Sequence, residues 1–357
     1  YKEIFIAHYN NYNGVKMKNK FIKFLIATLI VCFCVFPLNA ASASTEIYLG
    51  GIPAGFSLNT RGVTIVGITD VNTENGKVSP GKEAGLKLGD VILSINDQEI
   101  NNSKDIAAAV TDGKPAVVEF TRAGENMQTV IKPEKDALGK YKLGLFIRNY
   151  VSGIGTLTYV KDGKFTSLGH PILDEQGNLI EITGGSLLNC TITGVIKGER
   201  GRAGELKGVF LKNTAFATAE YNTKTGVTGT MKEGEVERLN LRKVEMGEAK
   251  VGSATVYTTV NGSEPKEYSM SIVKVDKGEK DNKNLVIKIT DDELIDITGG
   301  IVQGMSGSPI LQNGRLVGAV THVLVNDPTR GYGIFAQTML EQAKNAVQNG
   351  AEAQTAE

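Results

Sequence analysis

A serine between small residues is the strongest candidate for chemistry in this chain. It lies in the segment Gly304-Met305-Ser306-Gly307-Ser308-Pro309, which hydrophobic, strand-like runs flank. Glycines allow a tight bend that exposes the hydroxyl of Ser306, and the surrounding backbone N–H groups can then point at one position where an oxyanion forms. The same pattern also fits an ordinary turn of small residues. The segment therefore indicates either a nucleophile or a structural bend.

A serine nucleophile needs a general base within hydrogen-bond reach, and histidine titrates in the useful range. Two histidines follow the apolar N-terminal part of the chain. His170 comes after a strand-like run and beside a turn, where a functional side chain can be exposed. His322 lies inside the apolar run Val317–Val325, where a position in the core or in a pocket wall is the default. We favour His170 as the base over His322.

The carboxylate that would orient this base is harder to choose. Most aspartates before a loop cap a turn or a helix, and this interpretation fits Asp292 and Asp296. Asp291 stands at the end of a strand-like run, a natural place for a buried partner of an imidazole. Asp174 and Asp327 are further options.

Composition indicates the fold class. The 357 residues, of which 41% are hydrophobic, are enough for two domains of ordinary size. The 39 basic and 39 acidic residues balance, which gives no reason to expect a nucleic acid or another polyanion as partner. The 42 glycines and the absence of tryptophan, together with many Val, Ile and Thr residues, favour a turn-rich, mainly β protein.

The N-terminal part indicates targeting. Residues 1–16 show no periodicity, and we interpret them as an upstream translated segment. Residues 17–43 contain a basic stretch, the apolar run Phe24–Leu38 and the small residues Ala41-Ser42-Ala43, as in a signal peptide. The apolar run is short for a membrane span, which favours a cleaved signal over a permanent anchor. In either case we expect the functional part outside the cytoplasm.

Cysteines and histidines give no sign of a metal or another cofactor. Two cysteines lie in the apolar signal run and Cys190 stands alone in the rest of the chain, where a buried small hydrophobic residue is the default interpretation. No ligands are paired at metal spacing. We therefore expect no metal and no cofactor.

Residues 45–135 form a first predicted domain. The segment 79–90 contains Ala-Gly-Leu-x-x-Gly-Asp and strongly resembles the signature of PDZ domains. Such domains add an extended peptide to a sheet edge and often hold its carboxylate on backbone N–H groups. The run 54–57 matches the apolar–Gly–apolar form of that loop, so we predict Gly55 and Phe56 as peptide-binding residues. The alternative is an ordinary strand entry in a domain that acts only as a spacer.

Residues 138–342 form the second predicted domain, and residues 343–357 a polar C-terminal tail. The second domain contains many short β runs separated by turn dipeptides such as Asn313-Gly314, which indicates an all-β sandwich or a pair of barrels. Its segment Lys197–Gly204 is rich in glycine and charge. We interpret it as a solvated surface turn, because a phosphate-binding loop would need a helix after it.

The run Thr298–Ile310 resembles the active-site segment of the stage IV B sporulation peptidase family. The segments Leu168-Gly169-His170 and Ala319–Val323 extend the match, as does the order of a PDZ domain before a peptidase domain. The resemblance implies a chymotrypsin-like double β-barrel with a catalytic triad. His170 matches the base of that family, Asp291 its acid and Ser306 its nucleophile. The order His, Asp, Ser is that of chymotrypsin-like enzymes.

The resemblance also implies how the site would work. The N–H groups of Gly304 and Ser306 would form the oxyanion hole, while Thr321 and His322 would border the substrate pocket and offer it an edge strand. The family consists of serine endopeptidases that are secreted across the forespore membrane into the space between two membranes. There they cleave a membrane-associated regulator, which activates the processing of a late sigma factor. Self-cleavage and peptide binding by the PDZ domain are further expectations.

Two other functions remain open at this point. The protein could be a secreted PDZ scaffold or peptide-binding protein whose peptidase domain has lost activity. It could also be a quality-control protease of the periplasmic type, although such enzymes usually place the PDZ domain after the protease domain.

Overall fold

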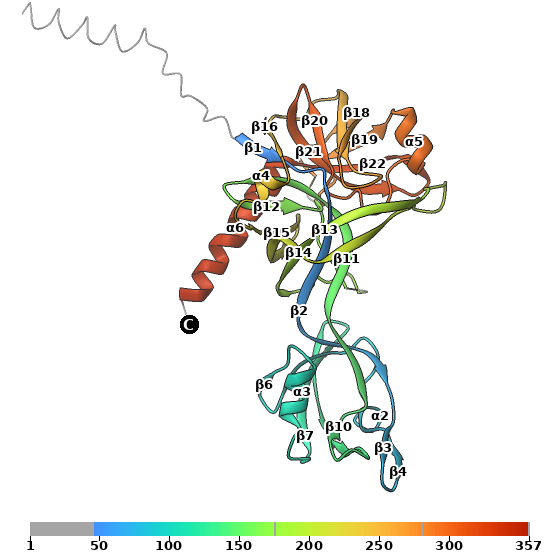
Figure 1. Ribbon diagram of the computed structural model, residues 1–357, viewed down its shortest axis with the longest axis vertical. Coiled ribbons are helices and arrows are strands. Elements are labelled where there is room, and N and C mark those ends of the chain that lie inside the picture. The colour runs from blue at the N-terminus through green and yellow to red at the C-terminus, as the bar shows by residue number, and fades with distance from the viewer. Residues whose placement is uncertain (1–45, 175, 280, 356–357) are drawn as a thin grey trace, which may run out of the picture. The chain divides into compact units, whose positions relative to one another are not determined.

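The computed structural model describes residues 46–174, 176–279 and 281–355. The predicted upstream segment 1–16 and the predicted signal peptide 17–43 lie outside these residues. Within the described ranges, no helix is long and apolar enough to cross a membrane. The described chain is mainly β, as the sequence predicts (Figure 1).

Six strands pair in a closed ring that forms the first half of the peptidase-like body. In order around the ring they are β2 (Pro53–Ile68), β13 (Ile182–Ile196), β14 (Glu205–Thr223), β15 (Gly226–Met231), β12 (Lys164–Ser167) and β11 (Leu145–Lys161). The pairing of β11 with β2 closes the ring. Its interior is apolar because alternate side chains point inward, and Leu58, Leu157, Phe165 and Phe216 are fully buried there.

Short elements extend this ring. They are β1 (Glu46–Leu49), which pairs with the end of β11, β16 (Arg242–Glu245), which pairs with β1, and α4 (Glu235–Arg238).

A second group of six strands forms a closed barrel. In order they are β17 (Gly252–Thr258), β18 (Lys266–Val275), β19 (Leu285–Ile289), β22 (Asp327–Phe335), β21 (Arg315–Leu324) and β20 (Pro309–Gln312). Val256, Ile272, Ile287 and Val320 fill its core. The predicted pair of β-barrels is thereby confirmed.

Two helices accompany the closed barrel. The short helix α5 (Asp292–Thr298) follows β19, and α6 (Ala336–Thr355) follows β22. Met339 and Leu340 of α6 are buried in a cluster that includes Leu316 of β21. The residues predicted as a polar tail continue this helix as far as Thr355, because its first turns are fastened to the barrel.

The PDZ unit has a core of its own, in which Ile65, Ile92, Val118 and Ile131 are buried. Its further elements are β3 (Val71–Thr73), β4 (Gly76–Val78), α2 (Pro80–Glu83), β5 (Val91–Ile95), β6 (Gln98–Glu99), α3 (Ser103–Ala109), β7 (Ala116–Arg122), β8 (Glu125–Ile131), β9 (Glu134–Lys135) and β10 (Tyr141–Lys142).

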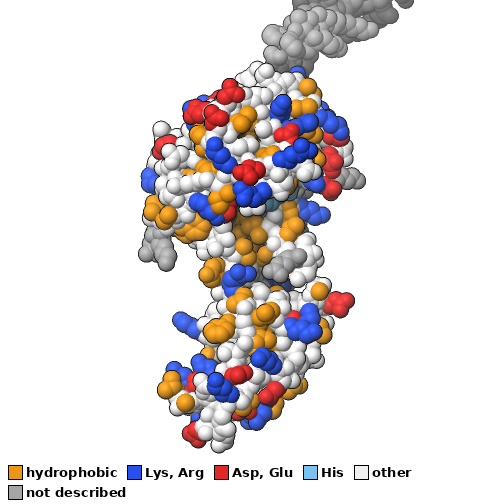
Figure 2. All heavy atoms as spheres, turned by 90° about the vertical axis from the view of Figure 1, so that its right-hand side faces the viewer, with side chains coloured by type: hydrophobic (Ala, Val, Ile, Leu, Met, Phe, Trp, Pro, Cys, Tyr) orange, Lys and Arg blue, Asp and Glu red, His pale blue; other side chains and the backbone are white. Residues whose placement is uncertain are grey.

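On the face shown in Figure 2, basic and acidic side chains are interspersed over the surface.

Strands β2 and β11 belong to both domains. Residues 53–59 of β2 pair with residues 150–156 of β11 in the ring, whereas residues 64–68 pair with residues 145–148 within the PDZ unit. The boundaries therefore differ from the predicted ranges 45–135 and 138–342. Long-range partners decide to which core a strand belongs, and the local sequence of a strand does not contain that information.

Candidate active site

The turn around Ser306 lies between α5 and β20 and is pressed against the segment that carries His170. Gly307 has a φ of +92°, and a Cβ there would lie 2.3 Å from the carbonyl oxygen of Thr156 and 2.5 Å from the nitrogen of Leu168. Only glycine fits this left-handed, crowded position. This close approach brings a turn from the closed barrel to Leu168, which directly follows β12 of the ring and precedes His170 by two residues.

Backbone and side-chain hydrogen bonds fix the turn. The Ser306 hydroxyl donates to the carbonyl of Thr321 at 2.9 Å. Thr156 of β11 is 2% exposed and holds the turn twice, since its N–H donates to the Ser306 carbonyl at 3.0 Å and its hydroxyl to the Gly304 carbonyl at 2.9 Å. Sequence reasoning missed Thr156, for which the only signal was a polar residue within an apolar strand.

The second serine of the turn is enclosed. Ser308 is fully buried, and its hydroxyl donates to the Thr258 hydroxyl at 2.8 Å. A substrate cannot reach it. Ser308 therefore has a structural role, and Ser306 is the accessible hydroxyl of the pair.

Two backbone N–H groups of the turn have no acceptor. Met305 N–H donates to Val302 at 3.1 Å and Gly307 N–H to Val320 at 2.8 Å, whereas neither Gly304 nor Ser306 donates a backbone hydrogen bond within the described residues. Unpaired N–H groups on a tight turn can bind an anionic oxygen. These are the two groups that we predicted for the oxyanion hole, and their role stays a prediction.

His170 follows a sharp bend after β12, where Leu168 has a φ of +70°. Its Nδ1 lies 2.9 Å from the carbonyl oxygen of Pro171. A carbonyl can only accept, so Nδ1 carries the hydrogen in this contact and Nε2 is left as the proton acceptor. Burial lowers the pKa of His170, and the hydrogen bond to Pro171 offsets part of this effect. The neutral form that a general base requires is therefore favoured.

His322 lies beside His170. The ring centroids are 5.2 Å apart and the rings are tilted by 42°. The partial removal of its ring from solvent lowers the pKa of His322 to about 4, and the nearby His170 and Lys283 add to this. His322 follows Thr321, whose carbonyl accepts the Ser306 hydroxyl, and one edge of β21 pairs at His322 with Tyr332 of β22. The predicted pocket residues thus lie beside the turn.

Asp291 lies apart from this group. It is the N-cap of α5, where one carboxylate oxygen accepts from Leu294 N–H at 3.1 Å and the other from Ser269 N–H at 3.0 Å. Burial raises the pKa of Asp291, but these backbone donors outweigh it and leave the pKa lowered. Among the described residues, no hydrogen bond joins Asp291 to His170. The triad is not assembled here, and the orienting role of Asp291 stays a prediction.

The prediction for Gly55 and Phe56 is wrong. Both residues lie in the middle of β2, which pairs on one side with β11 (Gly55 with Ile154) and on the other with β13 (Phe56 with Leu187). Phe56 is 3% exposed in the core of the ring. A strand with neighbours on both sides has no free edge, so these residues cannot receive a peptide.

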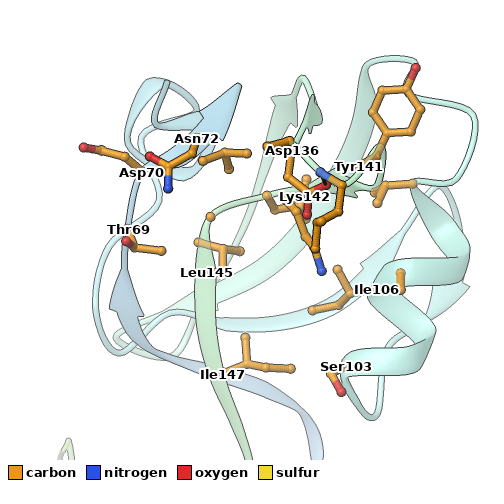
Figure 3. A pocket seen from close by; sticks show the side chains of 17 residues that line it. Thr69, Asp70, Asn72, Ser103, Ile106, Asp136, Tyr141, Lys142, Leu145 and Ile147 are labelled. Atoms are coloured by element: carbon orange, nitrogen blue, oxygen red, sulfur yellow. Dashed lines mark hydrogen bonds between the residues drawn. The ribbon is translucent and has the colours of Figure 1, made fainter. Parts of the chain in front are cut away.

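A cavity of about 460 Å³ lies elsewhere in the PDZ unit, between α3 and the start of β11. Figure 3 shows Leu145 and Ile147 of β11 facing Ile106 of α3, with the Lys142 side chain between them. Among the described strands, residues 145–148 of β11 pair only with β2, so their other edge is open toward α3.

The loop before this strand contains a second apolar–Gly–apolar pattern, Leu143-Gly144-Leu145. Gly144 has a φ of +68°, and a Cβ there would lie 2.3 Å from the carbonyl oxygen of Thr69, so no other residue fits. The apolar–Gly–apolar pattern thus occurs twice, and this copy precedes a strand with an open edge. Only the position of the strand beside α3 distinguishes the two copies.

Known families and proteins resemble parts of this chain. A family model described as SpoIVB peptidase S55 matches residues 139–340, and a PDZ-domain model matches residues 76–122. The probable protease eep of Enterococcus faecalis is 38% identical over 97 residues, which are 25% of this chain and 23% of that protein. The mitochondrial serine protease HTRA2 of Drosophila virilis is 39% identical over 57 residues, or 16% of this chain and 14% of that protein.

Among solved structures, the PDZ domain of an SdrC-like protein from Listeria monocytogenes is similar. Its sequence identity is 20% and its TM-score 0.20, and the match covers 24% of this chain and 87% of that one. The chain thus spans less than a quarter of the length of the two curated relatives described above.

Proposed function

Because this chain belongs to the SpoIVB peptidase S55 family, we propose that it is an extracytoplasmic serine endopeptidase of sporulation signalling that cleaves a membrane-associated regulator. One observation carries the catalytic part of this proposal. The Ser306 hydroxyl lies on a turn with two N–H groups that have no acceptor in the described part of the chain, and this turn packs closely against the segment that ends in His170. A nucleophile, an oxyanion site and a neutral base are thus available together.

The proposed reaction is acyl transfer. The Ser306 hydroxyl leaves the Thr321 carbonyl, gives its proton to Nε2 of His170 and attacks the scissile carbonyl carbon. The N–H groups of Gly304 and Ser306 bind the oxygen that becomes negative. His170 then protonates the leaving amine, and water releases the acyl group by the same steps in reverse. The Pro171 carbonyl keeps the imidazole in the required tautomer throughout.

A serine-reactive probe such as a fluorophosphonate tests this assignment. We expect labelling and peptide hydrolysis in the wild-type protein and in Ser308→Ala, because Ser308 is buried. Ser306→Ala should lose both, since it lacks the nucleophile. Labelling that persists in Ser306→Ala would remove Ser306 from the mechanism. A folded wild-type protein that is never labelled but still binds peptides would instead favour the inactive PDZ scaffold.

We further propose that the cavity beside α3 binds an extended peptide, either a C-terminus or an internal strand, on the open edge of β11. The apolar side chains of Ile106, Leu145 and Ile147 and the free strand edge support this role. Ile106→Ser should weaken peptide binding about tenfold, because an apolar contact of roughly 1.5–3 kcal/mol is reduced. Lys104→Ser, an exposed change on the same helix, is the matched control. Equal affinities of both variants in fluorescence anisotropy would exclude this cavity.

Secretion and self-cleavage complete the proposal. The basic stretch, apolar run and small residues within residues 17–43 support export. N-terminal sequencing of the exported protein reports signal cleavage, and a comparison with Ser306→Ala reports self-cleavage. Identical shortened N-termini in both proteins would show that another protease makes the cuts.

A further inference from the structure

The hairpin tip Lys197–Gly204, which joins β13 to β14, is fastened to the turn that carries the proposed oxyanion site. The sequence suggested a solvated turn, and Arg200 and Arg202 are indeed exposed. Gly198 and Gly204 at the two ends of the tip are nevertheless buried. The tip reaches from a hairpin of the six-stranded ring to the closed barrel.

Four backbone hydrogen bonds make the connection. Gly198 N–H donates to Thr298 at 2.8 Å, and Gly201 N–H donates to Val325 at 2.8 Å. Gln303 donates its N–H to Gly204 at 2.9 Å and accepts the N–H of Leu206 at 2.9 Å. The last two bonds engage the N–H and the carbonyl of Gln303, which precedes Gly304.

The bond from Leu206 controls the direction of the Gly304 N–H. The carbonyl of Gln303 and the N–H of Gly304 belong to one planar trans peptide group, in which they point in opposite directions. Fixing that carbonyl on β14 therefore aims the Gly304 N–H away from β14. The Leu206 side chain is 2% exposed and lies against Gly304, where a Cβ would be only 3.0 Å from that of Leu206.

We propose that this hairpin, through the backbone of Leu206 and Gly204, positions the Gly304 N–H for the oxyanion. The inference rests on the proposed peptidase function. Leu206 and Gly204 are positioning residues, since they act through Gln303 and do not touch the substrate. Donors contribute to catalysis when they are oriented before the reaction, and losing one typically lowers the rate by about 10²–10³. Disruption of the bond between Leu206 and Gln303 should therefore lower kcat, while KM stays nearly unchanged.

Two substitutions of Leu206 distinguish the effect of its backbone hydrogen bond to Gln303 from the effect of its side-chain packing. Leu206→Ala removes most of the side chain and keeps the N–H, whereas Leu206→Pro also removes the N–H. This N–H points at Gln303 and away from β13, so proline leaves the ladder with β13 intact. We expect kcat to fall at least tenfold more in Leu206→Pro than in Leu206→Ala. A peptide boronate, which forms a tetrahedral anion on serine, should bind more weakly by a similar factor.

Amide hydrogen exchange gives a readout that does not depend on activity. Exchange of the Gln303 and Gly304 N–H groups should be faster in Leu206→Pro than in Leu206→Ala and the wild type. If Leu206→Pro fails to fold by circular dichroism, Gly204→Ala takes its place, because a Cβ there would lie 2.4 Å from Gly198 N and Ile196 O. Gly204→Ala is then compared with the wild type.

The outcomes are distinct. Equal kcat values for the proline and alanine variants, or for Gly204→Ala and the wild type, together with unchanged exchange at residues 303 and 304, would overturn the proposed positioning. A wild-type protein without Ser306-dependent hydrolysis would instead contradict the peptidase function, while the exchange experiment would still test the hairpin.

Discussion

The hydroxyl of Ser306 donates a hydrogen bond to the backbone carbonyl of Thr321, and Nδ1 of His170 lies within hydrogen-bond distance of the backbone carbonyl of Pro171. In the proposed mechanism, attack begins with a rotation of the serine side chain from Thr321 toward Nε2 of His170. The turn itself need not move, because Thr156 donates hydrogen bonds to the carbonyl groups of Gly304 and Ser306. At the scale of single residues, the proposed site combines a turn held by hydrogen bonds with a serine hydroxyl that must exchange its partner.

The pH dependence of the reaction should follow His170. Hydrolysis needs the neutral imidazole, and burial lowers the pKa of His170 below its ordinary value of 6.5. A lower pKa keeps the base neutral to a lower pH. We therefore expect the acid limb of kcat/KM to have its midpoint below pH 6.5, measured with an uncharged peptide substrate. A midpoint at or above 6.5 would contradict the burial of the free base.

Asp291 allows a sharper test with two substitutions. Asparagine caps a helix about as well as aspartate, whereas alanine does not. If Asp291 acts only as the N-cap of α5, the variant Asp291→Asn should keep the wild-type rate within a few fold. The variant Asp291→Ala should lose about 0.5–2 kcal/mol of unfolding free energy. These are the outcomes that the observed contacts predict.

A triad member would behave differently at this position. Loss of the orienting carboxylate lowers kcat by about 10⁴ in serine proteases with a triad. A loss of that size in Asp291→Asn, in a protein that still unfolds cooperatively in urea, would show that Asp291 reaches His170 in the active form, as the sequence predicts.

At the scale of elements, β11 connects the two proposed sites. Its first residues, including Leu145 and Ile147, line the peptide cavity, and Thr156 near its end holds the oxyanion turn. The β13–β14 hairpin holds the same turn from the other side. The turn therefore depends on two strands of the ring, although it belongs to the closed barrel.

Thr156→Val should damage both stability and activity. Valine has the same shape but cannot donate to Gly304, so a carbonyl of the turn loses its partner at an expected cost of about 1–3 kcal/mol. Urea unfolding and kcat measure the two effects. Thr158→Val is a matched control on the same strand, since the buried Thr158 hydroxyl has no hydrogen-bond partner among the residues that the structure describes. Equal losses in both variants would contradict the role of Thr156.

At the scale of the whole molecule, the domains cannot be separated at the boundaries that the sequence indicates. The ring needs residues 53–60 of β2, which precede the PDZ unit, and residues 150–161 of β11, which follow it. The PDZ unit is therefore an insertion between two paired strand segments. Removing everything before residue 138 would delete β2 together with Leu58, open the ring and expose the remaining core residues Leu157, Phe165 and Phe216.

Two shortened chains test this organisation. A fragment of residues 138–342 should fail to fold, because it lacks β2 between β11 and β13. A chain from residue 46 onward in which a short turn replaces residues 61–149 should fold, since Asn59 and Tyr150 are already paired neighbours. Circular dichroism and thermal unfolding compare the two. A cooperatively folded 138–342 fragment would show that β2 is dispensable.

The sequence predicted the parts that depend on local chemistry. The Gly-Asp signature indicated a PDZ domain, in which Asp90 is buried and paired with Arg122. The glycines around Ser306 predicted a tight turn, and the position of His170 after a strand predicted a ring beside a bend, although that ring is largely buried. Turn dipeptides and short β runs indicated an all-β sandwich or a pair of barrels, and the resemblance to the peptidase family favoured the barrels. Each of these signals acts within a few residues, because backbone conformation there is limited by the side chains present.

Only the tertiary structure decided which segments meet. It placed Gly55 and Phe56 inside a paired strand, left an edge of β11 open beside α3, put Asp291 at a helix cap, and joined a hairpin tip to the turn around Ser306. A strand, a carboxylate and a charged loop each have many partners that would satisfy their hydrogen bonds. The choice among these partners is made by the packing of the whole chain, so the residues of one segment do not determine it.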